Sequence, residues 1–128
     1  METFRIKTES LITSNRVSDV LCSAFEGGSN YWAEVVSKRK PKAWPNTPES
    51  ERGYSFNYPL NPGGVVVIRA KEDGPTLYRL TYKSIKRGLQ LMASEHGSEF
   101  ADIISEHDDA GTADTLLQLC LFGKVVYG

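Results

Sequence analysis

Acidic side chains and a histidine gather in one stretch near the C-terminal end of the chain, "SEFADIISEHDDAG". The residues that could do chemistry here are Glu99, Asp102, Glu106, His107, Asp108 and Asp109. Carboxylate oxygens and an imidazole nitrogen that converge on one point can bind a metal ion or, with shifted pKa values, transfer protons. Charge runs of this kind are more often solvated helix faces, and the spacing of a calcium-binding loop is not met. The sequence therefore favours a solvated face over a metal site or an acid–base cluster.

Other signatures of catalysis or cofactor binding are weak. Ser29 in "EGGSN" follows a predicted helix and precedes a predicted strand, the reverse of the strand-to-helix turn that exposes a catalytic serine. Cysteine and histidine do not occur in the closely spaced pairs of a zinc site. The glycine-rich stretches do not connect a strand to a following helix, as phosphate-binding loops do. We therefore expect no bound metal and no cofactor. An enzyme is the alternative to a non-enzymatic binding protein, which we favour.

A second group of candidate residues combines aromatic rings with cations. Its members are Glu26, Asn30, Tyr31, Trp32, Lys38, Arg39, Lys40 and Trp44. Aromatic rings stack on nucleobases while cations neutralise phosphate, and Trp, Tyr and Arg also dominate the binding energy of protein interfaces. The group therefore suits either a planar, phosphate-bearing ligand or a partner protein. The simpler alternative is a core aromatic residue beside a solvated basic run.

Backbone rules predict the geometry around "FEGGSNYW". We expect Gly27, with Gly28 close behind it, to end the preceding helix in the left-handed conformation, so that Gly27→Ala would cost about 1 kcal/mol or more of stability. Adjacent residues of a strand point to opposite faces, so only one of Tyr31 and Trp32 can face the core. The other ring would then line a surface depression that the following loop can cover.

Periodicity and end signals place the elements that must position these residues. Alternating apolar and polar residues predict one strand around Phe4 and Ile6 and another over "NYWAEVVS". Between them, apolar residues at helical spacing predict a helix that Ser14 caps. Five of the six prolines lie from Lys38 to Pro62, so we expect a long exposed loop at about 38–62.

The second half of the chain predicts a hairpin followed by helices. "GGVVVIRA" and "TLYRLT" flank the turn-rich "KEDGP", which indicates two antiparallel strands at the centre of the sheet. Thr81 can cap a helix over "YKSIKRGLQLMASE". "SEFADIIS" and "TADTLLQLCLFG" continue the helical pattern, the latter capped by Thr112 and stopped by Gly123. The expected fold is a single α+β domain over residues 1–128, with an antiparallel sheet of about four strands and three to four helices packed against it.

Length and charge fit one globular domain and exclude some partners. The chain has 128 residues, 40% of them hydrophobic and 24% charged, with a formal net charge of -1. No global field therefore attracts nucleic acid or a membrane, and we expect neither membrane binding nor non-specific DNA binding. Cys22 and Cys120 fall in apolar helical patterns, so we expect both thiols to be reduced and buried. The charged start of the chain lacks the apolar run of a signal peptide, which predicts an intracellular location.

Two stretches, "DVLCSAFEGGSNYWAEV" and "TADTLLQLCLFGKVVYG", resemble the two ends of a widespread group of small bacteriophage and prophage proteins without an assigned activity. Between these ends such proteins carry a β-hairpin leading into a helix, similar to "GGVVVIRAKEDGPTLYRLTYKSIKRGLQ" here. The resemblance spans most of the chain except the 38–62 loop. It implies a phage origin and action in the cytoplasm of the infected host cell, and it carries over no catalytic residue.

That implication shapes the two functions we expect. The first is a non-enzymatic phage protein that acts against a host defence, either by sequestering a nucleotide-like ligand or by docking on a host protein. The alternative is a small enzyme of nucleotide metabolism or cleavage that uses the acidic and histidine residues near 99–109. Assembly into a homo-oligomer is left open by the sequence.

Overall fold

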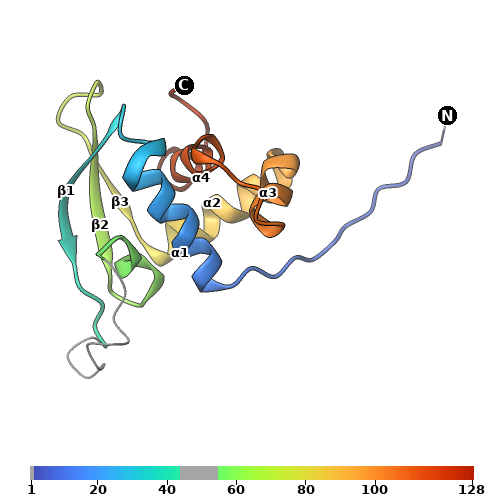
Figure 1. Cartoon of the computed structure of the whole chain (residues 1–128), viewed down its shortest axis with the longest axis horizontal. Helices are drawn as coiled ribbons and strands as arrows, with labels where there is room; N and C mark the ends of the chain where they lie inside the picture. Colours follow the sequence, from blue (N-terminus) through green and yellow to red (C-terminus); the bar gives the residue numbers. More distant parts are fainter. Residues whose placement is uncertain (1, 44–54) are drawn as a thin grey trace.

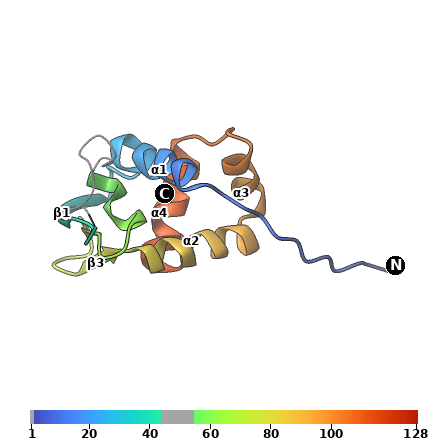
Figure 2. The same ribbon diagram turned by 90° about the horizontal axis from the view of Figure 1, so that it is seen from below.

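The computed structural model describes residues 2–43 and 55–128 and shows an α+β fold in two layers (Figure 1). The elements in chain order are α1 (Ser14–Ser23), the π-helical turn η1 (Ala24–Gly28), β1 (Ala33–Arg39), the 3₁₀ helix η4 (Ser55–Leu60), β2 (Val65–Ala70), β3 (Leu77–Leu80), α2 (Tyr82–Glu95), α3 (Gly97–Ile104) and α4 (Ala110–Phe122). The strands form one layer and the helices lie together on one side of it (Figure 2). None of the described helices is long and apolar enough to cross a lipid bilayer.

The sheet has three strands within the described ranges, in the order β1-β2-β3 with antiparallel neighbours. The hairpin prediction is confirmed, since β2 pairs with β3, and β2 is the central strand. The register of β1 on β2 shifts between Val35 and Ser37, which makes Val36 a bulge. The bulge lies in the middle of an edge strand.

The expected fourth strand, around Phe4 and Ile6, does not form. Residues 2–13 adopt neither helix nor strand, and these two side chains are 87% and 78% exposed. Alternation of apolar and polar residues is compatible with a strand, but a strand needs a partner that supplies its hydrogen bonds. No hydrogen bond joins the backbone of residues 2–12 to other described residues.

Helix ends follow the predicted chemistry with shifts of a few residues. Thr13, not Ser14, caps α1, because its side chain accepts a hydrogen bond from the Arg16 backbone. Thr81 caps α2 as predicted. Asp109 caps α4, and Thr112 is its reciprocal partner in a capping box rather than the cap itself. Gly123 ends α4 in the left-handed conformation as predicted, with φ 74°.

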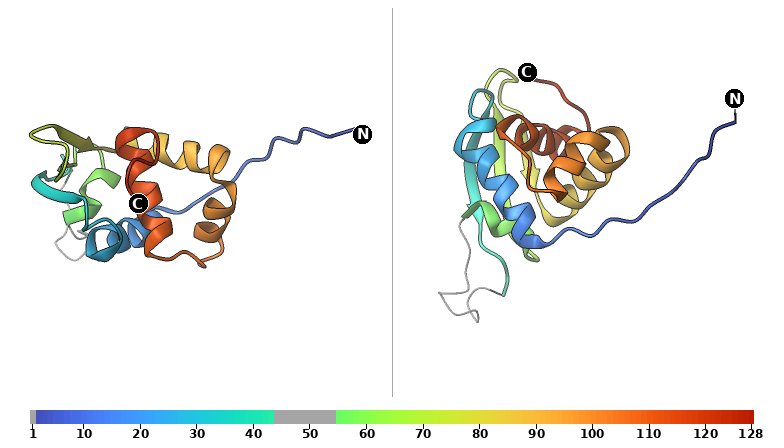
Figure 3. Two further views of the ribbon diagram at one scale, coloured as in Figure 1. Left: turned by 90° about the horizontal axis from the view of Figure 1, so that it is seen from above. Right: turned by 45° about the vertical axis from the view of Figure 1, so that its right-hand side comes forward.

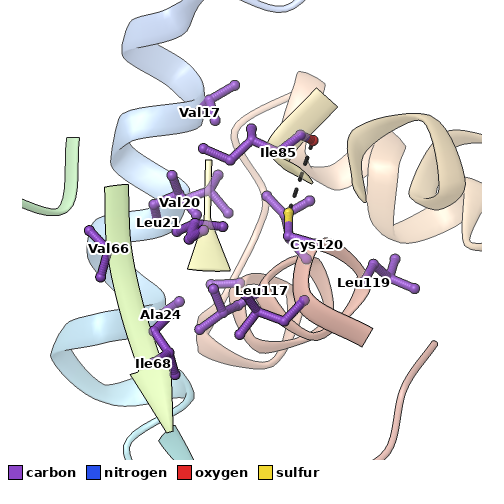
Figure 4. Close-up of a cluster of buried hydrophobic side chains, with 14 of the residues drawn as sticks. Val17, Val20, Leu21, Ala24, Val66, Ile68, Ile85, Leu117, Leu119 and Cys120 are labelled. Atoms are coloured by element: carbon purple, nitrogen blue, oxygen red, sulfur yellow. Dashed lines mark hydrogen bonds between the residues drawn. The ribbon is translucent and has the colours of Figure 1, made fainter. Parts of the chain in front are cut away.

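The core lies between the sheet and the helices and joins the two ends of the sequence. Figure 4 shows apolar side chains of α1, β2, α2 and α4 meeting in it. Gly88 of α2 packs so closely on α4 that an added Cβ would lie 2.3 Å from the Cys120 sulfur. Both cysteines are free thiols as predicted, but only Cys120 is fully buried, since Cys22 is partly exposed.

The glycines after α1 do not serve as the left-handed cap that the sequence predicts. Neither Gly27 nor Gly28 has positive φ. The helix ends instead in the π-turn, where the Ser29 backbone N–H donates to the Ala24 carbonyl at 2.8 Å. Gly28 is required for a different reason: a Cβ there would lie 2.4 Å from the carbonyl oxygen of Ala110, the first residue of α4.

The two glycines should therefore respond differently to alanine. We expect Gly28→Ala to lower the free energy of unfolding by about 1–3 kcal/mol, because the backbone of α4 must shift to make room. Gly27→Ala is the matched control, since nothing lies within 4 Å of its added Cβ, and it should leave stability unchanged or raise it by up to about 1 kcal/mol. Urea denaturation measures both, and equal losses would contradict the close-approach argument.

The two thiols should also differ in reactivity. Burial raises the pKa of Cys120 to about 12, and the thiolate is the form that reacts. We expect Cys120 to react with a maleimide only when the protein unfolds, and Cys22 to react faster. Mass spectrometry of a labelling time course, with Cys22→Ser as the comparison, would contradict this if Cys120 were labelled at the same rate as Cys22.

Candidate functional site

The Asp114 carboxylate is the point at which polar side chains converge. It lies in α4, is 8% exposed, and receives hydrogen bonds from the loop between η1 and β1. Ser29 Oγ donates to Oδ1 at 2.8 Å and Trp32 Nε1 donates to the same oxygen at 2.7 Å. The Tyr31 hydroxyl donates to Oδ2 at 2.6 Å. The "GGSNYW" loop is thus tied to α4 by three side chains.

Gln118, one helical turn after Asp114, extends the network to the last residues of the chain. Its Nε2 donates to Asp114 Oδ2 at 3.2 Å and to the Tyr127 carbonyl at 3.0 Å. Its Oε1 accepts from the backbone N–H groups of Val126 and Tyr127 at 2.7 and 2.8 Å. The Tyr127 ring stacks on Trp32, with centroids 5.2 Å apart. We call Ser29, Tyr31, Trp32, Asp114 and Gln118 the Asp114 cluster.

The Asp114 cluster is saturated with internal bonds. Each carboxylate oxygen accepts two side-chain donors, and every buried polar side-chain atom of the described residues has a partner. Burial, and then the hydrogen bond to Asp114, raises the pKa of Tyr31 to about 12. The Tyr31 hydroxyl therefore stays protonated at neutral pH and keeps donating. The arrangement can fix a loop, but it offers no free oxygen to a substrate.

Sequence reasoning missed Asp114 and Gln118, although a signal for them exists. The helix "AGTADTLLQLCLF" is mostly apolar, and its Asp and Gln are four residues apart, which places them on one face. Polar residues in an otherwise buried helix need hydrogen-bonding partners. The loop "GGSNYW" supplies three donors for them.

One aromatic residue of the Tyr31–Trp32 pair is in the core and the other is not, as predicted. Trp32 is 1% exposed and Tyr31 is 53% exposed. The reason is not strand alternation, because both residues precede β1 and lie in a turn, where the Trp32 N–H donates to the Ser29 carbonyl at 3.1 Å. Their shared acceptor, Asp114, sets their orientations instead.

The other predicted site residues are not brought together. Glu26 is exposed in η1 and Asn30 in the turn before β1, and the Asn30 carbonyl accepts from Lys71 Nζ at 2.6 Å. Lys38, Arg39 and Lys40 are exposed at the other end of β1. The seven-residue strand separates the two groups by about 20 Å. Trp44 lies outside the described residues.

The face of the sheet turned away from the helices gathers cations. Directly paired residues share a face, and Val66, Ile68 and Leu80 are in the core. The opposite face, which we call the outer sheet face, carries Glu34, Ser37, Arg39, Val65, Val67, Arg69, Leu77 and Arg79, of which Val65 is buried. All the described helices lie on the other side (Figure 3). One arginine therefore projects from each of the three strands.

Charge on the outer sheet face is positive. Glu34, its one carboxylate among the described strand residues, is paired with Arg69, and this hydrogen bond and charge lower the pKa of Glu34. Lys71 follows β2 and contributes to the same shift. Arg39 Nε donates to the Gly63 carbonyl at 3.0 Å. Arg79, opposite Val67, is exposed on the edge strand β3.

The acidic stretch near the C-terminus is used mainly in helix capping and pairing. Asp108 forms an ion pair with Arg16, which also donates to the Ile103 carbonyl at 2.9 Å. The Thr112 backbone N–H lowers the pKa of Asp109, the α4 cap. His107 Nδ1 lies 2.9 Å from Ser105 Oγ. In the described parts of the chain, no three His, Cys, Asp or Glu side chains lie close enough to hold a metal ion.

Comparison of the chain with models of protein families, with curated proteins and with solved structures found no match.

Replacing Asp114 should destabilise the whole fold. Asp114→Ala leaves the Ser29 and Trp32 donors buried without an acceptor, and we expect a loss of about 3 kcal/mol or more in the free energy of unfolding. Tyr31→Phe is the matched control, because it removes one hydrogen bond at a half-exposed ring, and it should cost about 1 kcal/mol. Denaturation followed by Trp fluorescence measures the free energy of unfolding of both variants. A larger loss in Tyr31→Phe than in Asp114→Ala would contradict the prediction.

Proposed function

We propose that the protein is a non-enzymatic binding protein that docks through its outer sheet face on an acidic surface of a partner protein. The observation that carries this proposal is the presence of Arg39, Arg69 and Arg79, one on each of three neighbouring strands, on a face that none of the described helices covers. A face of this kind attracts anionic surfaces and speeds their encounter. Arginine is also enriched among residues that contribute most to protein interfaces.

A partner protein suits this face better than a nucleotide. Among the described residues, Tyr78 pairs with Ile68 on the core side and the Tyr31 hydroxyl is turned to Asp114, so neither ring is available on the outer sheet face to stack a base. Val67 is paired with Arg79 and Leu77 with Arg69, and these two side chains give the face an apolar component. Such a mixture of apolar and arginine side chains is typical of protein interfaces.

The resemblance to bacteriophage proteins makes a host protein the partner we propose, and interference with a host defence the purpose. The enzyme alternative gains nothing from the 99–109 stretch. Of the acidic and histidine residues near 99–109, Asp108 is paired with Arg16 and Asp109 caps α4. Among the described residues, no three His, Cys, Asp or Glu side chains, those of Glu106 and His107 included, lie close enough to hold a metal ion.

Charge reversal on the outer sheet face tests the proposal. Wild-type protein is used to capture partners from a bacterial lysate, and the captured protein is identified, purified and titrated by calorimetry. We expect Arg79→Glu to weaken binding at least tenfold, about 1.4 kcal/mol, and wild-type binding to weaken as salt rises. The matched control is Lys83→Glu, an exposed cation on α2, which should bind as the wild type does.

Two results would contradict the proposal. Equal affinity of Arg79→Glu and wild type would remove the outer sheet face as the docking surface. Native mass spectrometry that showed a retained nucleotide, in Arg79→Glu as well as in wild type, would favour sequestration of a small ligand at another site.

A further inference from the structure

The first residues of the described chain form an exposed arm. Residues 2–12, which we call the N-terminal arm, extend away from the helices (Figures 1 and 3). Three of its apolar side chains, Phe4, Ile6 and Leu11, are 87%, 78% and 94% exposed. Large apolar side chains that are exposed together in one segment mark an interaction site more often than isolated ones do.

A large hollow lies where the N-terminal arm leaves the body. It has a volume of about 1160 Å³ and an apolar wall made by α2 and α3, with Ile85, Leu89, Ala93, Phe100 and Ile104 among its residues. We call this hollow the α2–α3 groove. The arm borders the opposite side through Ile6 and Leu11 but does not fill the space, since both side chains remain exposed. The groove and the arm are thus two unpartnered apolar surfaces of one chain.

We propose that the N-terminal arm of a second copy of this chain docks in the α2–α3 groove, and that two copies exchange arms across a two-fold axis. A symmetric exchange buries the apolar arm and the apolar groove of both copies, and the two-fold symmetry limits the assembly to a dimer. Eleven extended residues reach roughly 35 Å, which is far enough to cross to a neighbouring molecule.

The area available is that of a stable dimer. Burying Phe4, Ile6 and Leu11 removes on the order of 100 Å² of apolar surface for each side chain. The groove loses a similar area, and symmetry makes the contact twice. The total is roughly 1,200 Å², at the lower end of specific interfaces. The dimer should therefore form reversibly and depend on concentration.

Light scattering on the full chain tests the role of the arm. We expect a mass near twice 14.2 kDa for the wild type at high concentration, and at least a tenfold weaker dimer for Phe4→Ser combined with Ile6→Ser. The matched control is Arg5→Ser combined with Lys7→Ser, which changes the intervening polar positions and should remain dimeric. A monomeric wild type, or equal masses for the two variants, would overturn the proposal. Since the arm lies outside the core, circular dichroism should show all three folded.

Cross-linking distinguishes exchange between copies from docking of an arm on its own groove. Lys7 and Lys86 both border the groove, so an amine-reactive cross-linker can join them in either case. In an equal mixture of unlabelled and ¹⁵N-labelled chains, exchange should give Lys7–Lys86 peptides of which about half carry one label of each kind. Peptides with only matching labels would show docking within one chain and would overturn the proposal. Arg79→Glu should leave this result unchanged, which separates it from the function of the outer sheet face.

Discussion

The buried carboxylate of Asp114 is the interaction on which the arrangement of the chain depends. A carboxyl group in a protein interior is costly unless its oxygens are hydrogen-bonded. Here the donors come from the loop before β1 and from the next turn of α4, and Gln118 extends the network to Tyr127. Segments from both halves of the sequence are therefore positioned by one side chain, and none of them can move without leaving a polar group unpaired.

This arrangement separates the stabilising chemistry from the binding surfaces. The polar side chains of the Asp114 cluster are hydrogen-bonded to one another inside the fold. The outer sheet face and the α2–α3 groove lie on different sides of the molecule. The outer sheet face is charged and is not covered by any described helix, whereas the groove is apolar and bordered by the N-terminal arm. This difference in character is why we propose two different partners, an acidic protein for the first surface and a second copy of the chain for the other.

The sequence predicts the α+β class, the hairpin and most helix ends because these depend on local signals. Thr81 and Gly123 act within a few residues of themselves, and β2 and β3 are joined by a short turn. Features that depend on distant contacts are missed. Gly28 is needed because Ala110 approaches it, Tyr31 is oriented by Asp114, and the residues around Phe4 lack a strand to pair with. The predicted site fails to converge for the same reason, since β1 holds Asn30 and Lys38 apart.

The bulge at Val36 bears on whether the edge of the sheet can pair with a strand of another molecule. A regular edge strand invites another strand to add to it, which leads to aggregation. The shift between Val35 and Ser37 interrupts the row of backbone groups on β1, Lys38 and Arg39 follow it with charge, and the other edge, β3, has only four residues. Neither border extends easily into a larger sheet. For the docking that we propose, this leaves the side chains on the outer sheet face, which can discriminate between partners, rather than the backbone, which any extended chain could pair with.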